Sequence, residues 1–162
     1  MRFSFLALLF LSLSAAAGDL TLGQKAPPLT LQAVDGTSYS TEALRGKVII
    51  LHFWATWCVP CREEMPLIAR YAQVHAGQGI QVLGASIDNP GNLAEVKKVA
   101  ASIGFPVGLL GSNYAGGYGR IWRLPVTFVI DRNGLLRHNG WDDDQQPLTQ
   151  ELLDREVTPL LG

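Results

Sequence analysis

The sequence predicts an α/β domain in which helices flank a central mixed β-sheet, with an N-terminal β-hairpin extension in front of it. Two almost entirely apolar runs, residues 47–55 and 80–88, have the composition of strands buried on both faces. A helical pattern lies between them, and strands joined through a helix pair in parallel. A hairpin pattern at residues 125–141 is antiparallel, so the sheet is expected to be mixed.

The extension is predicted from residues 29–39, which form two short alternating runs. The runs flank Asp35-Gly36, a strong signal for a hairpin turn. We therefore expect residues 19–46 to be a small strand-rich segment that precedes the first buried strand.

The helix after the first buried strand is expected over residues 58–77. Pro60 is tolerated in a first helical turn, Glu63 and Glu64 favour the positive start of a helix, and Pro66 should kink it. The remaining elements, in chain order, are an amphipathic helix over 92–104, an apolar run over 105–110, a short glycine-rich helix over about 114–122, the hairpin turning at Arg132-Asn133-Gly134, and a last helix over about 148–161.

Length and composition indicate one globular domain, and its net charge indicates no strongly charged binding partner. The 162 residues suit a single core, and the hydrophobic fraction of 48% and charged fraction of 17% are those of a folded chain. Thirteen basic against fourteen acidic residues give a net charge of -1, without the basic stripe of a nucleic-acid binder. We expect a monomer that binds no nucleic acid.

Residues 1–17 have the order of a secretory signal peptide. Arg2 precedes an apolar stretch and then a run of small residues, and Ala15 and Ala17 fit the small-x-small cleavage rule. We place the mature domain at residues 18–162 and expect a periplasmic or secreted protein. An uncleaved membrane anchor is the alternative, although a span needs about 20 apolar residues.

Cys58 and Cys61 are the only cysteines and have C-x-x-C spacing. A structural disulfide there would close a very small loop and stabilise little. A zinc site needs four ligands, and His52, His75 and His138 are far apart in sequence. The sequence gives similarly little support for a copper-handling site, because soft metals need a ligand geometry that the sequence does not show. We expect no metal and no cofactor.

A reactive pair fits the position of the two sulfurs better. Cys58 lies at the end of a buried strand and the start of a helix, where the helix dipole favours a thiolate, the nucleophile of disulfide exchange. Cys61 lies one turn into the helix, close enough to attack a mixed disulfide formed at Cys58.

Three motifs together resemble the thioredoxin superfamily, in particular its exported TlpA/ResA-like thiol-disulfide oxidoreductases. They are FWATWCVPC at residues 53–61, the helix proline Pro66, and RLPVTFVIDRNG at residues 123–134. The resemblance covers roughly residues 20–160 and implies a thioredoxin-like mixed sheet with an N-terminal hairpin.

The resemblance also implies roles for individual residues. Cys58 corresponds to the attacking thiol and Cys61 to the resolving one, a pair that forms the redox-active disulfide. Pro125 corresponds to a cis-proline, whose loop lets the backbone of Leu124 pair with an extended substrate. Trp57 corresponds to a tryptophan that flanks the reactive sulfur. Val59 and Pro60, between the cysteines, are implied to tune sulfur acidity, and Trp54 is expected in the core.

Two further positions are candidates for proton transfer. Glu64, three residues after Cys61, matches a glutamate that lies near the active site in this branch, and burial would raise its pKa. Its alternative, shared with Glu63, is a solvated first turn that compensates the helix dipole. His52 stands where thioredoxin has a buried aspartate. It either holds a proton near neutral pH or is an ordinary hydrogen-bonded core residue, and we favour the latter.

The sequence therefore predicts an exported thiol-disulfide oxidoreductase that acts on protein substrates, such as apocytochrome c, as a reductant recharged by a membrane thiol reductase. A peroxiredoxin-like thiol peroxidase is one alternative, although its cysteine motif is missing before Cys58. A non-enzymatic metal-binding or partner-binding module on the same fold is another.

Overall fold

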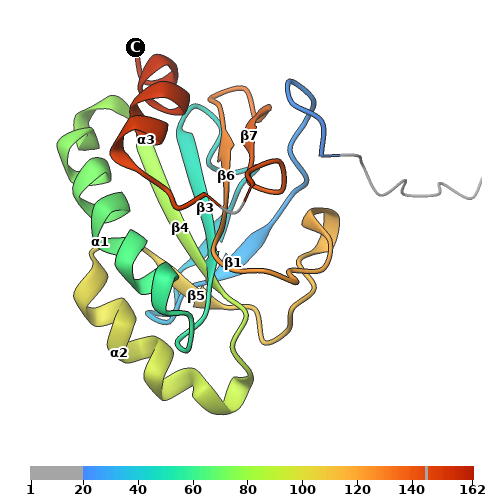
Figure 1. Ribbon diagram of the computed structural model, residues 1–162, viewed down its shortest axis with the longest axis vertical. Helices are drawn as coiled ribbons and strands as arrows, with labels where there is room; N and C mark the ends of the chain where they lie inside the picture. The colour runs from blue at the N-terminus through green and yellow to red at the C-terminus, as the bar shows by residue number, and fades with distance from the viewer. Residues whose placement is uncertain (1–19, 145) are drawn as a thin grey trace, which may run out of the picture.

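The computed structural model describes residues 20–144 and 146–162. A five-stranded sheet with strand order β5-β4-β3-β6-β7 forms its centre (Figure 1). The strands are β3 (Val48–Trp54), β4 (Ile80–Ser86), β5 (Val107–Leu109), β6 (Val126–Ile130) and β7 (Leu136–Asn139). A separate two-stranded hairpin consists of β1 (Thr30–Gln32) and β2 (Ser38–Ser40). The three α-helices are α1 (Val59–Val74), α2 (Leu93–Ile103) and α3 (Gln150–Glu156).

The pairing of the strands makes the sheet mixed, as predicted. β3 pairs in parallel with β4 and β4 with β5, whereas β6 is antiparallel to both β3 and β7. All seven residues of β3 are buried, because this central strand is covered on both faces. Consequently β3 and β4 end at the same edge of the sheet, and the start of β6 lies at that edge as well.

Helices α1, α2 and α3 cover one face of the sheet (Figure 1). Side chains alternate along β3, so that Ile50 and Trp54 join the core beneath the helices, and Leu51 and Phe53 join the core of the other face. The hairpin covers this second face. It approaches β5 so closely that a Cβ atom at Gly108 would lie 2.4 Å from the carbonyl oxygen of Gln32, and only glycine fits there.

Two predicted helices are wrong in extent. Residues 114–122 contain only a single 3-10 turn, Gly116–Tyr118, because three glycines weaken the helix and Tyr114 bridges Arg120 instead. The last helix is divided into α3 and a 3-10 turn, Thr158–Leu160, that contains Pro159. The two hairpins, the buried strands and helices α1 and α2 are confirmed.

The predicted signal peptide, residues 1–17, lies outside the described residues, as does the proposed start of the mature domain at Gly18. Over residues 20–144 and 146–162, we find no helix with the length and apolar character that a membrane span requires.

Candidate active site

Cys58 and Cys61 form a disulfide at the junction of β3 and α1, with an S–S distance of 2.05 Å and a Cα–Cα distance of 5.4 Å. Cys58 is the N-cap of α1, and its Sγ accepts a hydrogen bond of 3.3 Å from the backbone N–H of Cys61. This N–H and the helix dipole stabilise negative charge on Cys58 after reduction. Cys58 is 4% exposed and Cys61 is fully buried, so only Cys58 reaches the surface.

The residues around the pair divide into exposed and buried ones. Trp57 is 65% exposed and Val59 is also exposed, and both lie beside Cys58 in sequence. Pro60 occupies the first turn of α1, where its missing N–H costs no hydrogen bond. Trp54 is completely buried, as expected for a core residue.

The peptide bond between Leu124 and Pro125 is cis, the isomer that the resemblance implied. Both residues precede β6, which pairs with β3 so that Val126 lies opposite Phe53. Pro125 therefore lies next to the end of β3, from which the chain continues to Cys58. Leu124 is half-buried and packs against the same core cluster as Cys58.

Glu64 is the most perturbed carboxyl near the disulfide. It is 6% exposed, one helical turn after Cys61, and its Oε1 accepts a hydrogen bond of 2.9 Å from the backbone N–H of Leu148. Burial is the largest influence and raises the pKa of Glu64 from 4.5 to about 7; the Leu148 N–H opposes this rise and the charge of Asp143 adds to it. Glu63, in contrast, is exposed.

A small cavity connects Glu64 with the proline loop, and its lining includes Pro125 and Thr127. On β6, Thr127 Oγ1 lies 2.9 Å from Nδ1 of His52, which is completely buried in β3. Burial lowers the pKa of His52 to about 4, so the ring is neutral near pH 7. His52 is thus a hydrogen-bonded core residue, the alternative that the sequence analysis favoured.

Asp88, which the sequence analysis did not single out, fixes the loop before Cys58. Its carboxylate accepts hydrogen bonds from the backbone N–H of Thr56 at 2.8 Å, the Thr56 hydroxyl at 2.6 Å, the Ser86 hydroxyl at 2.7 Å and the Asn92 side chain at 3.2 Å. Burial alone would raise its pKa, but these bonds together lower it. Asp88 could have been predicted as a site residue from its position just after β4, because the end of β4 adjoins the end of β3.

Replacing Asp88 with alanine is expected to lower the free energy of unfolding by about 2–4 kcal/mol at pH 7, because Thr56 and Ser86 lose a charged acceptor. The lowered pKa means that the stability contributed by Asp88 is present above the unfolded value of 3.8 and is lost as pH falls through the folded value. Urea unfolding at pH 7 and pH 3 measures both effects. Asp144→Ala, at an exposed site, is the control, and equal losses in the two variants would contradict the assignment.

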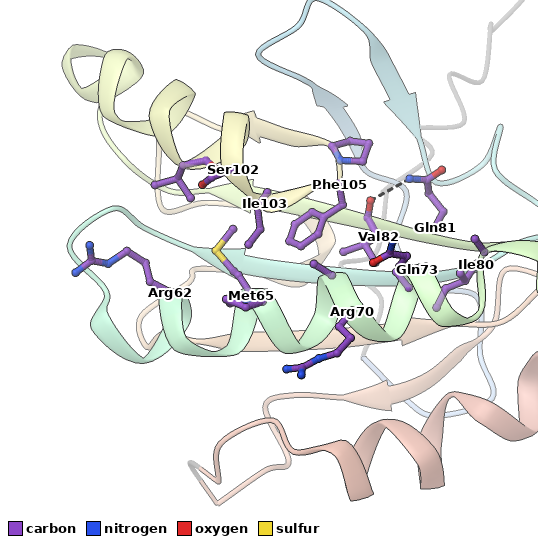
Figure 2. A pocket seen from close by; sticks show the side chains of 17 residues that line it. Arg62, Met65, Arg70, Gln73, Ile80, Gln81, Val82, Ser102, Ile103 and Phe105 are labelled. Carbon is purple, nitrogen blue, oxygen red and sulfur yellow. Dashed lines mark hydrogen bonds between the residues drawn. The ribbon is translucent and has the colours of Figure 1, made fainter.

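A separate groove, with a volume of about 920 Å³, lies between α1 and α2; Figure 2 shows its lining side chains. Met65, Ile103 and Phe105 form part of its apolar lining, while Arg62 and Arg70 project from α1. The lining contains no cysteine, histidine or carboxylate, so we assign it no part in the chemistry. Within the described residues, no group of three or more histidine, cysteine, aspartate or glutamate side chains is placed to hold a metal ion.

Comparison with known proteins places the chain in a family. Residues 22–139 match the family described as AhpC/TSA. The chain belongs to the AhpC/TSA family. One family relative is the thiol-disulfide oxidoreductase ResA of Geobacillus thermodenitrificans, which is 32% identical over 121 residues that cover 73% of this chain and 68% of the relative. Another is the thiol:disulfide interchange protein HelX of Rhodobacter capsulatus, 32% identical over 147 residues, with 86% and 77% covered.

The solved structures agree with this family assignment. A thiol:disulfide interchange protein of the thioredoxin family from Chlorobium tepidum superposes with a TM-score of 0.70 at 30% identity, covering 88% of this chain and 99% of that structure. The fold is therefore thioredoxin-like, and this member of the AhpC/TSA family is a thiol-disulfide oxidoreductase.

Proposed function

We propose that this chain is an exported reductant that transfers two electrons from Cys58 and Cys61 to disulfides in protein substrates. The observation that carries the proposal is the arrangement of the pair, with Cys58 at a helix start and 4% exposed, and Cys61 completely buried one turn behind it. A surface thiolate attacks an external disulfide, whereas a buried partner thiol can reach only the sulfur beside it.

The reaction balances without a cofactor. The Cys58 thiolate attacks one sulfur of the substrate disulfide, so that a mixed disulfide forms and the other substrate sulfur leaves as a thiolate. Cys61 then loses its proton and attacks Cys58 Sγ, which releases the second substrate thiolate. The product is the Cys58–Cys61 disulfide that the structure holds, and a membrane thiol reductase returns it to the dithiol.

The neighbouring residues supply positioning and proton transfer in this proposal. The backbone of Leu124, before cis Pro125, pairs with an extended stretch of substrate, and Trp57 forms the contact surface beside Cys58. Val59 and Pro60 tune the acidity of the sulfurs. Glu64 accepts the proton of Cys61. Apocytochrome c, which exposes cysteines in the same compartment, is the substrate we propose.

Trapping in cells tests the exchange. With Cys61→Ser, the mixed disulfide on Cys58 cannot resolve, so substrates should remain attached when the full precursor is expressed in its native host. Mass spectrometry then identifies them, with the double variant Cys58→Ser/Cys61→Ser as the control for nonspecific capture. Capture of exported thiol proteins only by the single variant supports the proposal, and equal capture by both variants rejects it. Alkylation of wild-type cells should find the pair mainly as thiols if the chain is a reductant.

A further inference from the structure

A groove of about 670 Å³ includes two exposed tryptophans in its lining, Trp57 and Trp122. They are 65% and 70% exposed, and Trp57 is the neighbour of Cys58 in sequence. Both tryptophans are close in sequence to the proposed substrate site, because Trp57 precedes Cys58 and Trp122 lies two residues before Leu124. A peptide bound along Leu124 with its sulfur at Cys58 therefore has neighbouring residues at this groove.

The fold holds Trp122 rigidly although most of its surface is in solvent. Its ring stacks on that of Trp141 with centroids 5.7 Å apart and planes at 9°. The Arg123 guanidinium lies 5.6 Å from the Trp122 centroid and 5.4 Å from that of Trp141. Arg123 is itself fixed by three backbone carbonyls, those of Gly140, Trp141 and Asp143, at 2.6, 3.0 and 2.9 Å.

Trp141 is anchored in turn, since its Nε1 donates a hydrogen bond of 3.3 Å to the carbonyl of Tyr118 and its ring meets Phe128 edge-on at 6.1 Å. A side chain that is ordered before binding loses little conformational freedom on binding, and a rigid exposed tryptophan is typical of an interface residue that carries binding energy. Because Trp122 is already ordered by this stacking, its binding to a partner costs little conformational entropy.

The side chains at the groove offer surfaces on which an aromatic ring can stack. The oxygens of Asp88, the lining carboxylate, are each occupied by two donors, and the side chain is buried. Arg120, the lining cation, is exposed and makes no ion pair within the described part of the chain. Two indole faces and a guanidinium are surfaces on which an aromatic ring stacks well.

We infer that this groove is a specificity site, which selects substrates carrying an aromatic residue within a few positions of the cysteine that reacts with Cys58. The inference rests on the proposed function and narrows its substrate class. The occupant is an extended peptide segment of the substrate protein, and Trp122 acts by binding it rather than by taking part in the exchange.

Peptide binding tests the inference independently of redox chemistry. The probes are decapeptides in which serine replaces the cysteine and one phenylalanine is moved position by position along an otherwise alanine-based sequence. The best phenylalanine peptide should bind the oxidised chain roughly tenfold more tightly than its all-alanine counterpart. Trp122→Ala should reduce this preference to within twofold, whereas Trp122→Phe should keep most of it. Val74→Ala, at an exposed apolar site on α1, should leave it unchanged.

The inference fails if no phenylalanine position is preferred, if the preference survives in Trp122→Ala, or if Trp122→Ala lowers binding to phospholipid vesicles and not to peptides. A separate assay with cysteine-containing versions of the peptides, supplied as glutathione mixed disulfides, measures exchange. Exchange without aromatic preference overturns the groove assignment alone. Aromatic binding without any exchange overturns the proposed function and leaves the groove as a peptide-binding site.

Discussion

Replacing Cys58 with serine is expected to lower the rate of disulfide exchange by at least about a thousandfold, because a hydroxyl does not replace a thiolate as nucleophile. The structure explains why Cys61 cannot take over the role. Cys61 is fully buried one turn inside α1, and of the two cysteines only Cys58 has any exposed surface, 4%. The measurement is the reduction of a peptide disulfide by the pre-reduced chain, followed over a single turnover.

Cys61→Ser is the matched control for this prediction. It should keep the first attack near the wild-type rate and lose only the release step, so that one equivalent of peptide remains bound to Cys58. If Cys58→Ser reacted as fast as Cys61→Ser in the first step, the assignment of the attacking sulfur would have to be reversed. Hydrogen peroxide consumption by the same variants shows whether Cys58 also reduces peroxide.

Local patterns were sufficient for the parts of the fold whose side chains repeat with a clear period. β3 and β4 were predictable because a strand buried on both faces is continuously apolar, and the turn at Asp35-Gly36 because its residues prefer that backbone. The segment 114–122 was wrong because its glycines fit a helix end and an irregular loop equally well. Its single turn is fixed by the core around Tyr118.

From the residues alone, the site was predictable only where its chemistry lies within one short stretch of sequence, and cis Pro125 was implied only by the resemblance. Cys58 and Cys61 are three residues apart, and their position at a strand end and helix start indicates a reactive pair, whose disulfide the resemblance implied. Glu64 meets its hydrogen-bond donor Leu148 across 84 residues, and Asp88 meets Thr56 across 32. Such partners depend on which strand ends adjoin in the sheet. The stack of Trp122 on Trp141 likewise depends on a contact between distant residues. Arg123 lies beside both rings and donates a hydrogen bond to the carbonyl of Gly140, which follows β7.

Replacing Glu64 with glutamine is expected to remove a large pH dependence of stability. The pKa of Glu64 is raised in the folded chain, so folding is favoured while the carboxyl keeps its proton. This stability is fully present below the unfolded value of 4.5 and is lost as pH rises through about 7. The wild type should therefore lose about 3 kcal/mol of unfolding free energy between pH 4.5 and pH 8 that Glu64→Gln does not lose.

Urea unfolding of both oxidised proteins over this pH range measures the difference, and Glu63→Gln supplies the control, since Glu63 is exposed on the same helix. His52 is present in all three proteins. Its lowered pKa removes stability as pH falls from 6.5 to about 4, and this contribution cancels in the comparison. Parallel stability curves for wild type and Glu64→Gln would show that the Glu64 carboxyl titrates as an ordinary exposed group.

The same substitution separates a proton acceptor from a structural carboxyl. Attack by Cys61 on the mixed disulfide requires loss of its proton, and a carboxylate with a pKa of about 7 is well matched to accept that proton near neutral pH. The rate of substrate release from Cys58 should rise through about pH 7 in the wild type. In Glu64→Gln it should be about a hundredfold lower and should lack that inflection. Glutamine still offers a carbonyl to the Leu148 N–H, so a purely structural role predicts an unchanged release rate and pH profile.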